Sequence, residues 1–130
     1  MNDVTRPLVV AAAVIEEDDR FLVTRRLRGV HLEGYWEFPG GKCEPSEDLG
    51  ACLRREIAEE LGTVAITGAE LLCVSHDYPE RTVELHFIAC RLAASPTPLL
   101  GQEMRWVTRD ELKALAFPPA DEALIAMLQA

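Results

Sequence analysis

The sequence predicts a mixed α/β fold in one domain, and three observations support that prediction. Residues 8–17 are rich in Val, Ala and Ile, which is typical of a buried strand. Residues 48–61 contain no proline and repeat leucine or isoleucine every fourth position from Leu49, as in an amphipathic helix. The chain has 130 residues, 48% of them hydrophobic, which suits a single core. We therefore assign residues 1–130 to one domain.

The first part of the chain predicts a β-hairpin. Residues 8–17 form the first strand, residues 16–20 are polar and turn-like, and residues 21–24 are interpreted as the returning strand. Arg25 and Arg26 end the hairpin. Arginines in this position are either solvated or bind phosphate oxygens through the guanidinium group.

Aromatic residues flank Glu37 in the next segment. Trp36 and Phe38 alternate around it, so we expect their side chains to share a face. An aromatic ring on that face either packs in the core or stacks on a nucleotide base. His31, in the loop before it, is either structural or a substrate contact.

Three glutamates crowd one side of the predicted helix over residues 48–61. At ~100° per residue, Glu56 and Glu60 fall beside the apolar row and Glu59 lies at its edge. We expect Arg55, the nearest cation, to project from a different side. Like charges at i and i+4 repel, and a partly buried carboxylate is costly unless it is paired or binds a metal. Mg²⁺ or Mn²⁺ would relieve this conflict, and the alternative is a solvated acidic face.

A glycine turn precedes this helix. Gly40 and Gly41 allow positive φ angles and a close approach to a ligand, so the Gly40 carbonyl is a candidate oxygen ligand for the same cation. Pro45 and Ser46 are the expected start of the helix, and Gly62 is its expected C-terminal stop.

The second half alternates strands and short helices. Thr108 and Glu111 form a capping-box pattern that predicts a helix to about residue 115. We expect strands over residues 64–66, 70–77, 82–92 and 103–107, a proline-containing loop over residues 93–102 that flanks the site, and a last helix to about residue 129.

Charge and cysteine content narrow the possible partners. The formal net charge of −9 disfavours binding of duplex nucleic acid, which requires a basic surface. The longest apolar run, residues 8–15, is too short to span a membrane, and the N-terminus lacks a signal-peptide pattern. The four cysteines show no C-x-x-C or His/Cys ligand spacing, so we expect them to be reduced and mostly packed in a cytoplasmic protein.

The region from Gly41 to Gly62 resembles the Nudix box. Its pattern is G-x5-E-x7-R-E-apolar-x-E-E-x-G, and Thr63 departs from the aliphatic residue that the family carries next. The resemblance implies a Nudix-type α/β/α sandwich with a mixed sheet, and Mg²⁺-dependent hydrolysis of a nucleoside diphosphate linked to another moiety.

Further residues resemble the MutT branch of that family: Arg25–Arg26, His31, residues 37–42, and the Phe-Pro-Pro-Ala sequence at 117–120. The resemblance implies that the glutamates of the box helix hold the metal, that Arg26 contacts phosphate, and that Asp121 reads the base. Members specific for 8-oxo-dGTP carry Asn at the position of Asp121, whereas a similar CTP pyrophosphohydrolase branch carries Asp. The complete set of expected site residues comprises catalytic Glu56, Glu59, Glu60 and Lys42; substrate-binding Arg26, His31, Phe38, Arg81 and Asp121; and the metal ligands Gly40, Glu56, Glu59 and Glu60.

Asp121 has two possible roles. It is a suitable N-cap for the last helix. As a base reader, an ionised Asp only accepts hydrogen bonds, which suits the amine of cytosine or the N7–H of 8-oxoguanine, whereas a protonated Asp also donates to a guanine O6.

The expected activity is hydrolysis of a nucleoside triphosphate to monophosphate and pyrophosphate, with Mg²⁺ as cofactor (or Mn²⁺ in its place) and 8-oxo-dGTP as first choice of substrate. The alternatives are CTP or modified dCTP hydrolysis, a dinucleotide or sugar-nucleotide pyrophosphatase, and a non-catalytic nucleotide-binding module of the same fold. The sequence does not predict the oligomeric state.

Overall fold

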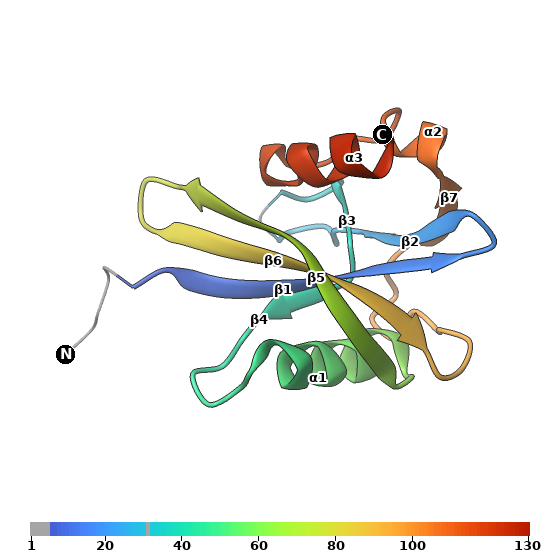
Figure 1. Ribbon diagram of the computed structural model, residues 1–130, viewed down its shortest axis with the longest axis horizontal. Helices are drawn as coiled ribbons and strands as arrows, with labels where there is room; N and C mark the ends of the chain where they lie inside the picture. Colours follow the sequence, from blue (N-terminus) through green and yellow to red (C-terminus); the bar gives the residue numbers. More distant parts are fainter. Residues whose placement is uncertain (1–5, 31) are drawn as a thin grey trace.

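A mixed β-sheet lies between helices in the computed structural model, which describes residues 6–30 and 32–130. Helix α1 covers one face of the sheet, and α2 and α3 lie on the opposite side (Figure 1). This arrangement confirms the predicted α/β sandwich with a mixed sheet. The elements are β1 (Leu8–Glu17), β2 (Arg20–Arg25), β3 (Trp36–Glu37), β4 (Gly40–Lys42), α1 (Leu49–Leu61), β5 (Ala65–Asp77), β6 (Thr82–Leu92), β7 (Met104–Thr108), α2 (Arg109–Leu112), a 3₁₀ turn η1 (Pro119–Asp121) and α3 (Glu122–Leu128).

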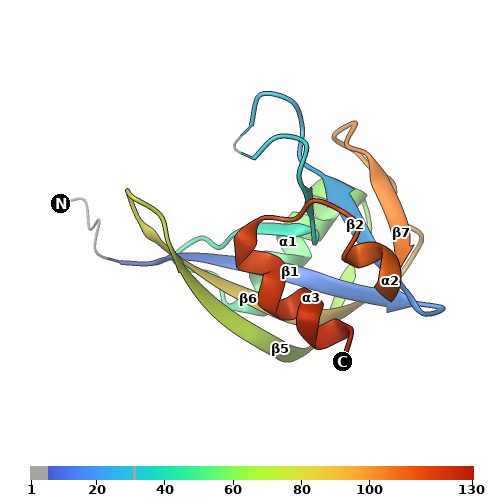
Figure 2. The same cartoon turned by 90° about the horizontal axis from the view of Figure 1, so that it is seen from above.

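Strand β1 holds the sheet together. It pairs in parallel with β6 and antiparallel with β2 and β4, while β6 continues to β5. The returning strand β2 pairs with β3 and β7. Seen from above, α3 crosses over β1 and β6 (Figure 2). The sheet therefore brings β4, which precedes α1, against the middle of β1.

The predicted hairpin between β1 and β2 closes through a two-residue turn. Asp18 and Asp19 have φ angles of 51° and 61°. Two successive positive φ angles match the right-handed twist of the flanking strands, and aspartate tolerates them better than most residues.

Alternation along β1 divides the apolar residues between two cores. Ala12 and Val14 pack with Phe87 and Leu124 on the side of α3. The residues between them face α1, and this second core consists mainly of Ala11, Ala13, Ile15, Leu22, Cys52, Leu53, Ile57, Leu61, Ala65, Ile88 and Cys90. Full burial of an aliphatic side chain contributes about 1.5–3 kcal/mol, so the apolar row of α1 fixes which side of that helix remains available to solvent.

Three element boundaries differ from the sequence predictions. Helix α1 begins after Asp48, whose Oδ1 accepts a 2.7 Å bond from the Ala51 amide, and not after Pro45 and Ser46. Residues 65–77 form one strand, because bulges near Thr67 and Glu70 absorb the irregularity that the sequence suggested as a break. Helix α2 keeps its predicted capping box but ends at Leu112. No helix in the described ranges is long and apolar enough to cross a bilayer.

Candidate active site

The glycine turn lies directly against the acidic side of α1. Gly40 has φ 152°, and a Cβ there would lie 2.0 Å from the Ala11 carbonyl oxygen, so only glycine fits against β1. A Cβ on Gly41 would lie 2.5–2.7 Å from the carboxylate of Glu56. The turn and the helix therefore form one surface, as the sequence predicted. Gly62 also ends α1 as predicted, with φ 66°.

Arg55 joins the turn to the helix. Its Nε and Nη2 donate to Glu47 at 2.7 and 2.8 Å, which confirms the expected pair, and Nη2 also donates to the Lys42 carbonyl at 3.0 Å. The Arg55 guanidinium holds the pKa of Glu47 down at about 2.

The expectation that Arg55 projects away from the acids is wrong. Its Nη1 donates to Glu56 Oε1 at 2.8 Å and lies 3.5 Å from Glu59 Oε2. The long arginine side chain reaches around the helix, so the angular position of its Cα does not determine where the guanidinium lies.

The three box glutamates gather on one side of α1, and they differ in burial. The side chain of Glu59 is 59% exposed, whereas that of Glu56 is only 16% exposed. Glu60 Oε2 is buried without a hydrogen-bond partner among the described residues. Burial, followed by the neighbouring Glu56, raises the pKa of Glu60 to about 9. A buried carboxylate oxygen without a partner, beside a second carboxylate, is the chemistry that a hard cation satisfies.

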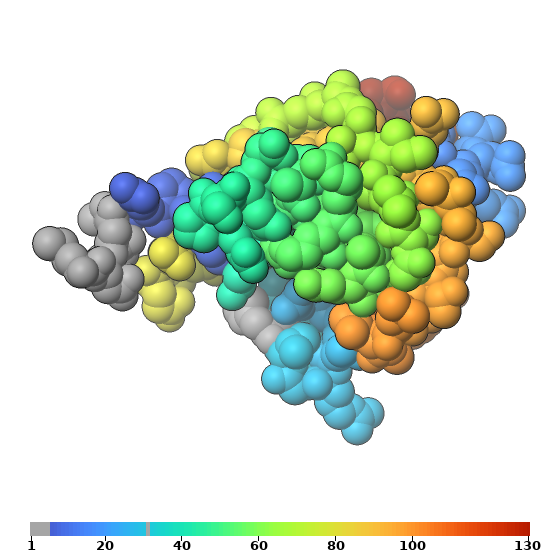
Figure 3. Space-filling view, turned by 90° about the horizontal axis from the view of Figure 1, so that it is seen from below, coloured from blue at the N-terminus to red at the C-terminus, as the bar shows by residue number. Residues whose placement is uncertain are grey.

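A cavity of about 270 Å³ contains all four expected metal ligands, Gly40, Glu56, Glu59 and Glu60. Figure 3 shows this side of the molecule, with α1 in green between the preceding turn and the orange segment near residue 100. The donor set consists of oxygen atoms only, which fits Mg²⁺ or Mn²⁺.

A second cavity, of about 500 Å³, adjoins the first. Both cavities are lined by Arg26, Glu37 and Gly40. The second is within the size range of small-molecule sites. Its lining includes every expected substrate residue that the structure describes, together with the expected catalytic lysine: Arg26, Phe38, Lys42, Arg81 and Asp121. His31 lies outside the described residues.

Arg26 and Glu37 form an ion pair between the two cavities. Arg26 Nη1 donates to Glu37 Oε2 at 2.9 Å, with both side chains about one-third exposed. Burial raises the pKa of Glu37, and the Arg26 pairing opposes that shift. The sequence indicated Arg26 but gave no signal for Glu37 as its partner.

Phe38 forms an aromatic wall of the larger cavity. Its ring stacks on Phe117 with centroids 5.4 Å apart and meets Phe87 edge-on at 6.0 Å. Trp36 belongs to the same apolar core, as the alternation predicted, but the guanidinium groups of Arg25 and Arg105 lie near its ring. Of the two aromatic residues, Phe38 is the one that lines the cavity.

The Asp121 side chain does not cap helix α3. The residue occupies the N-cap position of α3, but its side chain makes no capping hydrogen bond, so that predicted role is wrong. The 3₁₀ turn before α3 gives Asp121 a helical backbone, and the residue is only 6% exposed in the wall of the larger cavity. Burial, with a smaller effect from Glu37, raises its pKa to about 7.

The loop expected to flank the site also supports it. Gln102 is buried, and its Nε2 donates to the Glu60 carbonyl at 3.0 Å while its Oε1 accepts from the Leu100 amide at 2.9 Å. The Leu99 amide donates to the same Glu60 carbonyl at 3.0 Å. These bonds hold the C-terminal end of α1, a role for Gln102 that no sequence pattern indicated.

A third hollow lies elsewhere and is larger, about 670 Å³. It is formed near the β1–β2 turn by residues that include Arg20, Met104 and Trp106. None of the predicted site residues lines it. We place the candidate site in the two adjoining cavities because carboxylates, cations and an aromatic wall converge there.

Comparison with known proteins agrees with this geometry. A family model described as NUDIX domain matches residues 10–127. An 8-oxo-dGTP diphosphatase from Escherichia coli (strain K12) is 32% identical over 126 residues, covering 95% of this chain and 98% of the relative. A CTP pyrophosphohydrolase from the same organism is 32% identical over 124 residues, covering 93% and 90%.

Solved structures show the same architecture. The solution structure of the E. coli ORF135 protein has a TM-score of 0.85 at 30% identity and covers 94% of this chain and 88% of that one. The crystal structure of a MutT protein from Methanosarcina mazei Go1 has a TM-score of 0.84 at 23% identity, covers 95% and 94%, and supports the fold alone.

Proposed function

Because this chain belongs to the NUDIX domain family and is a MutT-like Nudix hydrolase acting on phosphorus-containing anhydrides, we propose that it is a Mg²⁺-dependent nucleoside triphosphate pyrophosphohydrolase. The observation that carries the proposal is the junction of the two cavities. The carboxylate-lined cavity suits cation-bound phosphates, the aromatic-walled cavity suits a base, and Arg26, Glu37 and Gly40 line both. A single nucleotide can therefore occupy both.

The ligands for Mg²⁺ are Glu56, Glu59, Glu60 and the Gly40 carbonyl. The buried Glu60 oxygen without a partner supports this assignment. A bound cation would neutralise phosphate charge and lower the pKa of a coordinated water.

The protein residues bind the phosphates and accept the proton. Arg26, Lys42 and Arg81 line the nucleotide cavity and offset phosphate charge as the bond between the α- and β-phosphates breaks. Glu56 is our candidate to accept the proton of the attacking water, because the Arg55 hydrogen bond orients its carboxylate. Water adds to the anhydride, and the products are a monophosphate and pyrophosphate.

The first candidate substrate is 8-oxo-dGTP. Phe38 offers a ring for stacking, and Asp121 has a pKa raised to about 7. Protonated Asp121 can donate to O6 while accepting from the N7–H of 8-oxoguanine. The name of the E. coli diphosphatase relative supports this choice.

CTP is the second candidate. Ionised Asp121 accepts hydrogen bonds only, which suits the exocyclic amine of cytosine. The name of the CTP pyrophosphohydrolase relative supports this alternative at the same level of identity.

A nucleotide panel tests the proposal. Formation of nucleoside monophosphate is measured directly by ion-exchange chromatography for 8-oxo-dGTP, dGTP, CTP, dCTP, a dinucleotide and a sugar nucleotide, each with Mg²⁺ and with excess EDTA. We expect turnover of a triphosphate that EDTA abolishes. Undiminished turnover after chelation refutes the metal assignment, and tight binding without turnover of any compound favours the non-catalytic alternative.

A further inference from the structure

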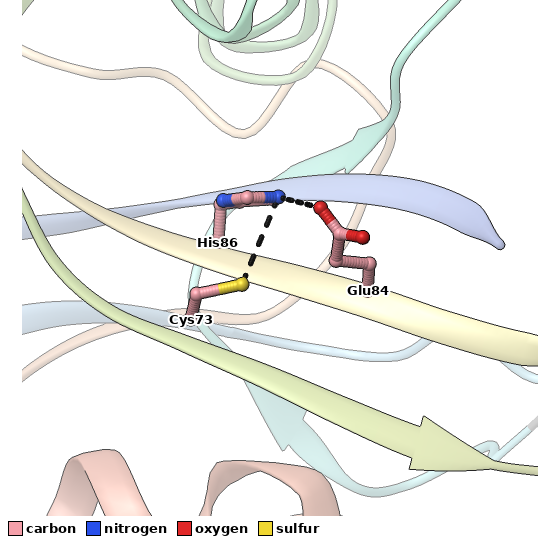
Figure 4. Close-up of side chains that lie close together, drawn as sticks. All are labelled: Cys73, Glu84 and His86. Carbon is pink, nitrogen blue, oxygen red and sulfur yellow. Dashed lines mark hydrogen bonds and ion pairs between the residues drawn. The ribbon is translucent and has the colours of Figure 1, made fainter.

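A second group of metal-ligand side chains lies on the sheet, outside both cavities. Cys73 of β5 is the direct cross-strand partner of His86 of β6, and Glu84 is two residues before His86 on the same face. One nitrogen, one sulfur and one carboxylate oxygen from these residues all lie within 4.8 Å of one another. The three side chains converge between the two strands (Figure 4).

A β-bulge adds a fourth residue to the group. Glu70 pairs with Ile88 and Leu72 with Phe87, so one extra residue of β5 is inserted between the two pairs. In a regular strand, residues three apart point to opposite faces. The inserted residue turns Glu70 to the face of Cys73, where its Oε1 lies 2.5 Å from His86 Nδ1.

Two carboxylates and a thiol surround the imidazole of His86. Its Nε2 lies 2.7 Å from Glu84 Oε1 and 3.8 Å from Cys73 Sγ, and its side chain is only 13% exposed. A protonated imidazole has two N–H groups and donates one to each carboxylate. A cation between the sulfur, the oxygen and Nε2 would take the place of the Nε2 proton and leave the Nδ1–H for Glu70.

The distances suit a tetrahedral ion. Zn–S of about 2.3 Å and Zn–N of about 2.0–2.1 Å place sulfur and nitrogen about 3.5 Å apart around tetrahedral zinc, close to the 3.8 Å between Cys73 Sγ and His86 Nε2. Glu84 needs only to withdraw from its direct hydrogen bond with His86 to admit the ion. Metal-bound histidines commonly donate their other N–H to a carboxylate, which is the position of Glu70.

We propose that Cys73, Glu84 and His86 form a binding site for a transition-metal ion of the Zn²⁺ class, with Glu70 orienting the imidazole and water in the fourth position. Binding releases the thiol proton and the Nε2 proton to solvent. Thiolate and imidazole select such ions over Mg²⁺, so this site differs in metal preference from the glutamate site on α1. Neither cavity of the candidate active site is lined by any of the three ligands.

Cobalt titration tests the site directly. The intact protein, kept reduced with a phosphine and saturated with Mg²⁺, is titrated with Co²⁺, and the bound Co²⁺ is then displaced with Zn²⁺. We expect one equivalent with the visible absorption of tetrahedral Co²⁺ and a thiolate-to-cobalt charge-transfer band. Cys73→Ser should remove that band, and His86→Gln should weaken binding at least about tenfold. Glu70→Gln should weaken it by about 10–100-fold, as for other outer-shell carboxylates.

Matched variants separate this site from others. His76→Gln removes a different histidine, which lies on β5, and this variant should bind Co²⁺ as the parent does. Glu56→Gln alters the glutamate site on α1 and should retain the charge-transfer band, so the outcome does not depend on the proposed hydrolase activity. Circular dichroism checks each fold, and Glu84→Gln provides a near-isosteric test if Cys73→Ser or His86→Gln does not fold. Absence of the band in the parent protein, or its persistence in Cys73→Ser, overturns the proposal.

Discussion

Replacing Asp121 with asparagine removes a buried acid while keeping the shape of the side chain. Asp121 is 6% exposed, and burial together with Glu37 raises its pKa from 3.8 to about 7. This rise in pKa corresponds to about 4 kcal/mol between the two protonation states. In the folded protein, ionised Asp121 is therefore costly, and Asp121→Asn should remove that cost.

The direction of the pH effect follows from proton binding. Between the unfolded pKa near 4 and the folded pKa near 7, the folded state binds more protons than the unfolded state at this position, so the parent loses stability as pH rises. Asp121→Asn lacks this contribution. The stability gain of the variant over the parent should thus increase by about 2–3 kcal/mol from pH 5 to pH 8.

Urea unfolding of both proteins in metal-free buffer at several pH values measures this difference. Glu60 is common to both proteins and cancels in the comparison, whereas the interaction between Asp121 and Glu37 is lost in the variant and forms part of the measured difference. An equal stability difference at pH 5 and pH 8 would show that Asp121 is not held in a desolvated position, and would remove the basis for its protonated form in base reading.

The same variant tests base selection. Asparagine donates and accepts at any pH, so Asp121→Asn should shift kcat/KM toward 8-oxo-dGTP relative to CTP by ~1–3 kcal/mol, the range for a buried hydrogen bond. Steady-state kinetics with both substrates on both proteins, at two pH values, measures the ratio. An unchanged ratio would place base selection elsewhere in the cavity.

Further predictions concern the acidic side of α1 and the products of the reaction. Glu56→Gln should lower kcat on the order of a hundredfold or more with the fold retained; near-normal turnover would refute its assigned role. The stability of this variant should not exceed that of the parent, because the variant loses the charge-assisted bond from Arg55; thermal unfolding measures this, and a higher melting temperature would show that repulsion among the glutamates outweighs the bond. Gly41→Ala should displace the Glu56 carboxylate, which would lie 2.5–2.7 Å from the added methyl group. The variant should have a lower kcat but a nearly unchanged free energy of unfolding, since the end of a side chain can move. A parent-like kcat contradicts the contact. Phosphorus NMR of the reaction without added pyrophosphatase should show monophosphate and pyrophosphate, and accumulating orthophosphate would exclude the proposed products.

The sequence predicted the positions of the α1 glutamates well because that information is local. Helical spacing alone placed Glu56 and Glu60 beside the apolar row, and glycine chemistry placed Gly40 against them, as the structure has them. The position of the Arg55 guanidinium was not predictable in this way, since a long side chain can reach several neighbours.

The features that the sequence did not predict depend on contacts between distant segments. Cys73 and His86 meet only in the β5–β6 register, and Glu70 joins them through a bulge that no residue pattern indicated. The burial of Asp121 likewise depends on how the 3₁₀ turn presents it to a cavity formed by other strands. Its favourable capping composition was therefore misleading.

The hydrogen bonds from Gln102 and Leu99 to the Glu60 carbonyl have a consequence for the order in which the molecule assembles. All three box glutamates emerge early from the ribosome, but the end of α1 that carries Glu60 lacks these bonds until some forty residues more have been synthesised. This end of the helix therefore cannot form all of these bonds on a nascent chain that ends before residue 102. Its completion is a late event in the synthesis of the chain.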